Sequence, residues 1–185
     1  MRSSSAMRAE PDWAAPAVSE EAAEAQAEAE AAEDAASTFL TFDLDGQTLG
    51  VAVRRVREIL DLQPMTRLPN APHEVRGVID VRGASVPILD LACRLGMGGG
   101  ETGEDTRVIV FESSGGQGRP RPVGVLADRV RDVRRIDREA VEAPPELGAG
   151  RLSPEVMIGL ARLDGALVVL VDLDRLFADS ALDFA

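Results

Sequence analysis

The chain has 185 residues, of which 45% are hydrophobic and 28% are charged, so it is long enough for one ordinary domain or for two very small ones that share a core. All 20 basic residues are arginine, and 32 acidic residues bring the net charge to −12. This balance argues against a general affinity for nucleic acid or anionic lipid, because phosphate contacts need a basic surface. One histidine and one cysteine are too few for a structural zinc site or an internal disulfide.

The acidity is concentrated at the N-terminus. Residues 1–37 hold two arginines against nine acidic residues, a net charge of −7, which leaves −5 for residues 38–185. This stretch of alanine and glutamate has few large apolar side chains, so it cannot bury enough surface to offset the chain entropy lost on folding. We expect a disordered tail over 1–37; the alternative is an acidic segment that docks on a basic partner.

No apolar run approaches the roughly 20 residues that cross a bilayer. The longest run spans only residues 166–171, and Arg2 and Arg8 are not followed by the hydrophobic segment of a signal peptide. We therefore expect a soluble, cytoplasmic protein without direct membrane insertion.

From Thr38 onwards, short β-rich runs alternate with turn signals. Residues 39–44 and 49–53 flank Asp45-Gly46, which predicts a hairpin. Further runs of strand length cover residues 75–81, 84–91, 106–111, 123–127 and 166–173. We expect strands to dominate residues 38–185.

The two halves of this region are similar in sequence. Residues 77–91 align without gaps with residues 159–173, and residues 50–59 align with residues 124–133. Neither half has much core of its own, which predicts two small β-barrels packed together. The duplicated halves are placed at about 38–97 and 104–178 and the glycine-rich linker between them at 98–103.

No pattern in the chain indicates an enzyme. Gly98 to Gly103 fit the spacing G-x-G-x-x-G, but a strand-like run follows where a dinucleotide site needs a helix. His73 lies in a turn-like stretch, and no G-x-S-x-G element supplies a nucleophile for it. Asp90 and Asp172 occupy equivalent strand ends and are expected to cap the helical turns that follow. We predict no catalytic residue, no cofactor and no metal site.

Six fragments occur in the order and approximate spacing of the CheW family of chemotaxis coupling proteins. They are FLTFDL at 39–44, VREI at 56–59, TRLPNAP at 66–72, RGVIDVRG at 76–83, VPILDL at 86–91 and DRV at 128–130. Over residues 38–177 the chain therefore resembles that family. The resemblance implies a mainly β fold of two intertwined five-stranded SH3-like β-barrel subdomains with short helices.

The resemblance also implies a function. A member of this family is expected to be a non-enzymatic adaptor that joins the cytoplasmic tips of methyl-accepting chemoreceptors to the regulatory domain of a CheA-type histidine kinase, in arrays at membrane-bound receptors. The alternative is a CheW-like adaptor of a non-flagellar pathway, with pili, development or a second messenger as output. A CheV-like protein would carry a receiver domain after this region, and we expect none because the chain ends at Ala185. A ligand-binding or nucleic-acid-binding barrel is disfavoured because only six residues are aromatic.

By the family pattern, five residues are candidates for receptor or kinase contact: Val56, Glu58, Gly77, Arg82 and Gly83. Val56 would supply apolar contact, Glu58 a charged rim, and Arg82 a guanidinium that binds a carboxylate or carbonyl. The alternatives are a core role for Val56, a solvated strand position for Glu58 and backbone requirements for the two glycines. Arg82 has the best claim, because its repeat partner is Asp164 and the scaffold itself does not demand arginine there.

The segment 129–138 is unusually rich in arginine. It is expected to be either a docking surface for an acidic partner, including the chain's own tail, or a charge stripe whose members pair with one another.

Overall fold

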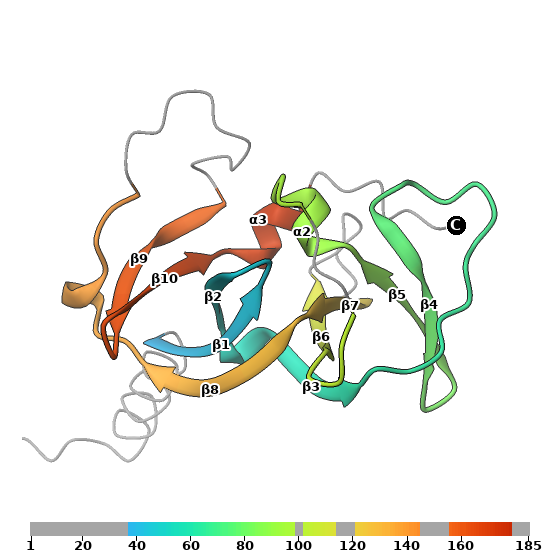
Figure 1. The fold of residues 1–185 in the computed structure, drawn as a ribbon, viewed down its shortest axis with the longest axis horizontal. Coiled ribbons are helices and arrows are strands. Elements are labelled where there is room, and N and C mark those ends of the chain that lie inside the picture. The colour runs from blue at the N-terminus through green and yellow to red at the C-terminus, as the bar shows by residue number, and fades with distance from the viewer. Residues whose placement is uncertain (1–36, 99–101, 114–120, 145–155, 179–185) are drawn as a thin grey trace, which may run out of the picture. The chain divides into compact units, whose positions relative to one another are not determined.

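The computed structural model describes residues 37–98, 102–113, 121–144 and 156–178 (Figure 1). The tail expected over 1–37 lies outside the described residues except for Ser37. The linker expected over 98–103 is described only at Gly98, Thr102 and Gly103. Both assignments stay predictions.

The described residues form two five-stranded sheets (Figure 1). In spatial order, the first sheet contains β8 (Arg129–Arg135), β1 (Thr38–Leu44), β2 (Gln47–Ala52), β10 (Ala166–Val171) and β9 (Met157–Leu163). The second sheet contains β3 (Val56–Asp61), β6 (Arg107–Ser113), β7 (Arg121–Ala127), β5 (Ala84–Leu89) and β4 (Val75–Val81). The mainly β fold with two five-stranded subdomains, predicted from the sequence, is confirmed.

Short helical segments join or follow the strands. They are η1 (Val53–Arg55), α2 (Leu91–Arg94), η2 (Arg138–Ala140) and α3 (Leu173–Ala178). The Asp90 carboxylate accepts a hydrogen bond of 2.9 Å from the Cys93 amide at the start of α2. Asp172 accepts one of 3.0 Å from the Asp174 amide, so both aspartates cap helical turns as predicted. In the part of the chain that the structure describes, no helix is long and apolar enough to cross a membrane.

Each sheet takes strands from both halves of the sequence. In the first sheet, β2 from the first half pairs in parallel with β10 from the second half. In the second sheet, β5 and β7 form the corresponding parallel pair. The chain crosses from the first sheet to the second through η1 after β2, and it crosses back at Asp128 between β7 and β8. The two subdomains are therefore intertwined.

Apolar side chains form three clusters, one inside each curled sheet and a larger one between the sheets. Strand β6 shows how the clusters arise, because Val108 and Val110 pack inside the second sheet while Ile109 and Phe111 belong to the cluster between the sheets. Since successive residues of a strand point to opposite faces, a strand buried on both faces needs a continuous apolar run. The central cluster, which includes Phe42, holds the two sheets together.

Candidate protein-binding site

Val56 begins β3, an edge strand of the second sheet. It lies opposite Phe111 and is half-buried against the cluster between the sheets. A register shift between Val56 and Glu58 places Val56 and Ile59 on the face of Phe111 and Ile109, while Glu58 shares the face of Val110. Ile59 is 41% exposed, so this edge of the central cluster reaches the surface.

Glu58 and Arg82 contact one another. The Arg82 Nη2 atom donates to Glu58 Oε2 over 3.0 Å, and the side chains are 83% and 14% exposed, respectively. The glutamate is thus largely covered, whereas the guanidinium keeps most of its five N–H donors in solvent. Two of the five predicted site residues therefore form one unit that presents a hydrogen-bond donor at the surface.

Arg82 and Gly83 are the two central residues of the turn between β4 and β5. Their φ angles are +53° and +85°, the combination that a two-residue type I′ turn needs. The Asp80 carboxylate accepts a hydrogen bond of 2.9 Å from the Gly83 amide. A Cβ at Gly83 would meet nothing within 4 Å, so glycine is favoured there because of the positive φ angle and not because of close packing.

Gly77 lies apart from this unit, buried in β4. A Cβ there would lie 2.6 Å from the Thr66 carbonyl oxygen, and φ is +154°. Thr66 and Val78 exchange two backbone hydrogen bonds of 2.9 Å each, so Gly77 makes room for the connection that leads from β3 to β4. The structure brings Glu58, Arg82 and Gly83 together. Val56 lies on the other face of β3, and Gly77 lies under the connection from β3 to β4.

The second repeat has the same architecture with the charges reversed. At the turn between β9 and β10, Asp164 stands where Arg82 stands in the first repeat, and its carboxylate accepts a hydrogen bond of 2.6 Å from Arg134 of β8. A Cβ at Gly159 would lie 2.6 Å from the Glu142 carbonyl oxygen, as one at Gly77 would from Thr66. The scaffold thus sets the turn and the glycine, whereas the side chain at the tip is free to differ.

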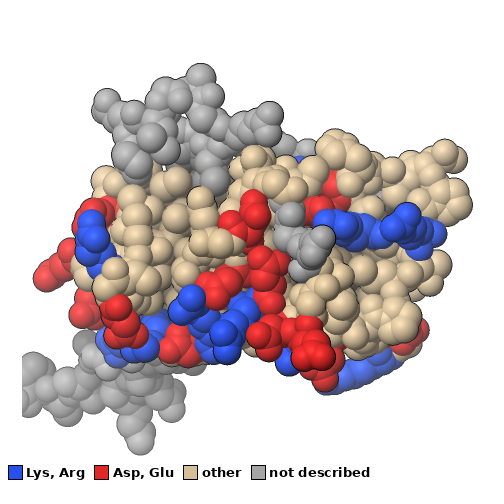
Figure 2. Space-filling view, in the orientation of Figure 1, with Lys and Arg blue, Asp and Glu red and all other residues tan. Residues whose placement is uncertain are grey.

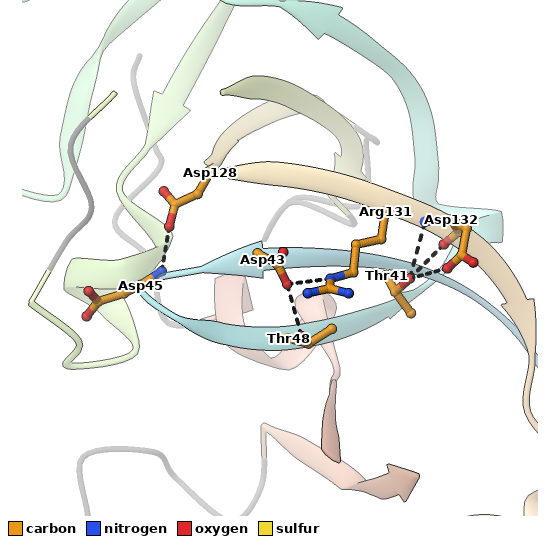
Figure 3. Close-up of polar contacts among 7 residues, drawn as sticks. All are labelled: Thr41, Asp43, Asp45, Thr48, Asp128, Arg131 and Asp132. Carbon is orange, nitrogen blue, oxygen red and sulfur yellow. Dashed lines mark hydrogen bonds and ion pairs between the residues drawn. The ribbon is translucent and has the colours of Figure 1, made fainter. Parts of the chain in front are cut away.

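The arginine-rich strand β8 forms a charge stripe whose members pair with neighbouring carboxylates. Arg131 donates to Asp43 over 2.7 Å (Figure 3), and Arg134 donates to Asp132 over 2.7 Å. Figure 2 shows arginine and carboxylate side chains next to one another along the lower margin, where β8 lies in Figure 1. Arg134 thus pairs within the segment 129–138, as the self-paired alternative predicts, whereas the partner of Arg131 lies outside the segment on β1.

Thr41 anchors β8 to β1. Its hydroxyl lies 2.8 Å from Asp132 Oδ1 and 2.9 Å from the Asp132 carbonyl oxygen (Figure 3). The hydrogen bond from Thr41 holds the pKa of the Asp132 carboxyl below its ordinary value, and the hydrogen bond from Arg134 acts in the same direction. Neither Thr41 nor the ion pair between Glu58 and Arg82 was predicted from the sequence.

Residues 38–181 match the family model described as CheW-like domain. The chain is 34% identical over 152 residues to the chemotaxis protein CheW of Klebsiella aerogenes, which covers 82% of this chain and 88% of that protein. It is also 34% identical over 127 residues to the protein FrzA of Myxococcus xanthus, with 69% and 75% covered. The crystal structure of the scaffolding protein TtCheW from Thermoanaerobacter tengcongensis superposes with a TM-score of 0.67 at 27% identity, over 76% of this chain and 87% of that one.

The intertwined pair of five-stranded sheets, with an exposed charged turn on each, defines a small, mainly β protein built from two repeats of one architecture. The chain belongs to the CheW-like domain family. The family resemblance predicted from the sequence is confirmed, and the chemotaxis adaptor expected from it fits these relatives.

Proposed function

We propose that the protein is a non-enzymatic chemosensory adaptor that couples the cytoplasmic tips of chemoreceptors to the regulatory domain of a CheA-type histidine kinase. Two findings support this function: the family membership of residues 38–181 and the similarity to a protein described as a scaffolding protein. The observation that carries the proposal is the ion pair between Glu58 and Arg82, which holds an 83% exposed side chain at the tip of the type I′ turn between β4 and β5.

The receptor tip is assigned to the edge of the second sheet at β3, where Val56 lies on one face of the strand and the pair of Glu58 and Arg82 lies on the other. A receptor tip is a helical hairpin, and an amphipathic helix offers an apolar stripe beside polar groups. Val56 supplies apolar area next to the central cluster, and Arg82 supplies paired donors for a carboxylate or a carbonyl. Glu58 fixes the direction of the guanidinium, and the chain reaches the membrane-bound array through these partners.

Signalling in this function needs no covalent chemistry in the adaptor. When receptor and kinase bind the same adaptor, the binding free energy at one interface depends on the conformation at the other. A change in the conformation of the receptor therefore changes which conformation of the kinase is favoured. The two sheets share one central cluster, which makes the body stiff enough for such coupling.

The test is reconstitution of a three-component complex from the full chain, the kinase regulatory domain and a soluble receptor-tip fragment. We expect the chain to bind each partner alone and both at once, measured by size-exclusion chromatography with light scattering. A sample that is folded by circular dichroism but binds neither partner would overturn the function and leave the fold standing.

A further inference from the structure

The connection between β3 and β4, residues 62–74, has a fixed path along the outer edge of β4 (Figure 1). Its Met65 side chain packs on the cluster inside the second sheet. The two backbone hydrogen bonds between Thr66 and Val78 follow directly, and the Val75 amide closes the segment with a bond of 2.9 Å to the Pro72 carbonyl oxygen. The residues after Thr66 are therefore held in place before any partner arrives.

Arg67 and Leu68 are the side chains that this connection presents next. Leu68 is 37% exposed, and Arg67 is exposed without an ion pair or hydrogen bond to any part of the chain that the structure describes. Arg76 and Arg82 on the same hairpin are both paired with carboxylates. Arg67 therefore offers an uncompensated positive charge beside an exposed apolar side chain.

The second repeat shows that the fold does not require these two residues. Glu142 makes the same backbone bridge to Leu160 that Thr66 makes to Val78. It is followed by Ala143, Pro144 and a further proline, where Thr66 is followed by Arg67, Leu68 and a proline. Alanine and proline occupy these positions in the second repeat, so the fold itself does not require an arginine and a leucine there.

The surface of Arg67 and Leu68 is separate from the tip at Arg82. Because Thr66 pairs antiparallel with Val78, the chain after Thr66 leads toward the start of β4, while Arg82 follows the end of that strand. Val78 and Arg82 alone are about 13 Å apart at 3.3 Å per residue. An adaptor must hold two partners at once, and these two surfaces lie far enough apart to do so.

We propose that Arg67 and Leu68 form the contact for the kinase regulatory domain, and that this domain meets them with a carboxylate beside an apolar recess. This assignment rests on the proposed function, in which the receptor tip takes the surface at Arg82. Charge complementarity selects an acidic partner group for Arg67, because no carboxylate of the described chain neutralises it. The fixed backbone lowers the entropy cost of binding, since the contact is formed before association.

The most specific test replaces the two residues that follow Thr66 with the two that follow Glu142; we call this variant the graft. The double variant Arg67→Ala/Leu68→Pro reproduces the sequence that follows Glu142, so it keeps a backbone that the fold already accepts. Arg129→Glu is the matched charge control, because Arg129 is also exposed and has no partner among the described residues. Each full-length variant is titrated separately with the kinase regulatory domain and with the receptor-tip fragment by isothermal calorimetry.

We expect the graft to weaken kinase-domain binding by about tenfold or more and to leave receptor-tip binding within about twofold, with Arg129→Glu unchanged in both titrations. Unchanged kinase-domain binding by the folded graft would overturn the proposal while leaving the adaptor function in place. A loss confined to receptor-tip binding would overturn the assignment to the kinase. Failure of the unmodified chain to bind either partner would instead overturn the proposed function itself.

Discussion

Arg82 and Asp164 occupy the same position in two equivalent turns, yet they carry opposite charges and pair with opposite partners. Arg82 contacts Glu58 of β3, and Asp164 contacts Arg134 of β8. Both turns have the same backbone, with φ of +53° and +51° at these two residues. The chain thus contains its own control for the role of charge at a turn.

Replacement of Arg82 by glutamate tests the receptor contact. We expect Arg82→Glu to weaken receptor-tip binding by about tenfold or more. It should also lower the free energy of unfolding by about 1–3 kcal/mol, because the Glu58 side chain is only 14% exposed and loses its charged partner. Asp164→Arg, the reverse change at the equivalent turn, should leave receptor binding unaltered. Urea unfolding and calorimetric titration check both statements, and equal losses of binding in the two variants would contradict the assignment.

The two site glycines are expected to respond differently to alanine. Gly77→Ala places a Cβ against the Thr66 carbonyl oxygen and should cost about 1–3 kcal/mol of stability. Gly83→Ala meets open space, so only the positive φ opposes it, at about 1–2 kcal/mol. Because the first change displaces the connection that carries Arg67, it should also weaken kinase-domain binding, whereas Gly83→Ala should not. The affinity of each variant for the kinase regulatory domain is measured by titration under conditions where both variants are fully folded. Equal affinities of the two variants would contradict this prediction.

The hydrogen bond between Thr41 and Asp132 predicts a pH dependence. A carboxyl whose pKa is lowered by folding adds stability that is fully present above its unfolded pKa of about 4 and is lost as the pH falls through the folded value. Thr41→Val removes the main cause of the lowered pKa of Asp132. Strand β6 has the same place in the second sheet as β1 has in the first, and its fourth residue, where β1 has Thr41, is already a valine, Val110. Urea midpoints measured from pH 2 to pH 6 should therefore vary less in this variant than in the unmodified chain. An identical pH profile would show that Asp132 does not contribute.

Loss of a side chain from the central cluster should unfold both sheets together. Phe42 is completely buried there, and Phe42→Ala is expected to cost about 3–5 kcal/mol. The far-UV circular dichroism should still change in one cooperative urea transition, since the cluster belongs to both sheets. Two separate transitions would mean that the sheets are stable independently.

The sequence predicted correctly those strands that have a clear alternating pattern of their own. The runs at 75–81 and 84–91 correspond closely to β4 and β5, because alternating apolar residues and a Gly-containing turn mark them. Strand β8 was predicted only as an arginine-rich segment, since four of its seven residues are arginine. It is a strand because it pairs with β1, and pairing with a distant segment leaves no local periodicity to recognise.

The candidate site was predicted in part for the same reason. Arg82 stood out because its repeat partner differs in charge, which is visible in the sequence. Its contact with Glu58 depends on the curvature that brings the β4–β5 turn back to β3, and curvature is a property of the whole sheet. Arg67 and Leu68 lie inside a fragment that the family resemblance used, but their exposure becomes apparent only when the bridge between Thr66 and Val78 is seen.

The exchange of strands between the sheets has a consequence for how such a protein can diversify. A single repeat, with two strands in one sheet and three in the other, could complete both sheets only by pairing with a second copy of itself, as in a domain-swapped homodimer. Rotational symmetry would then force identical side chains on the two ends of that dimer. Fusion of the two copies into one gene removes this constraint, so each end can mutate toward a different partner, and the opposite charges of Arg82 and Asp164 are one such divergence.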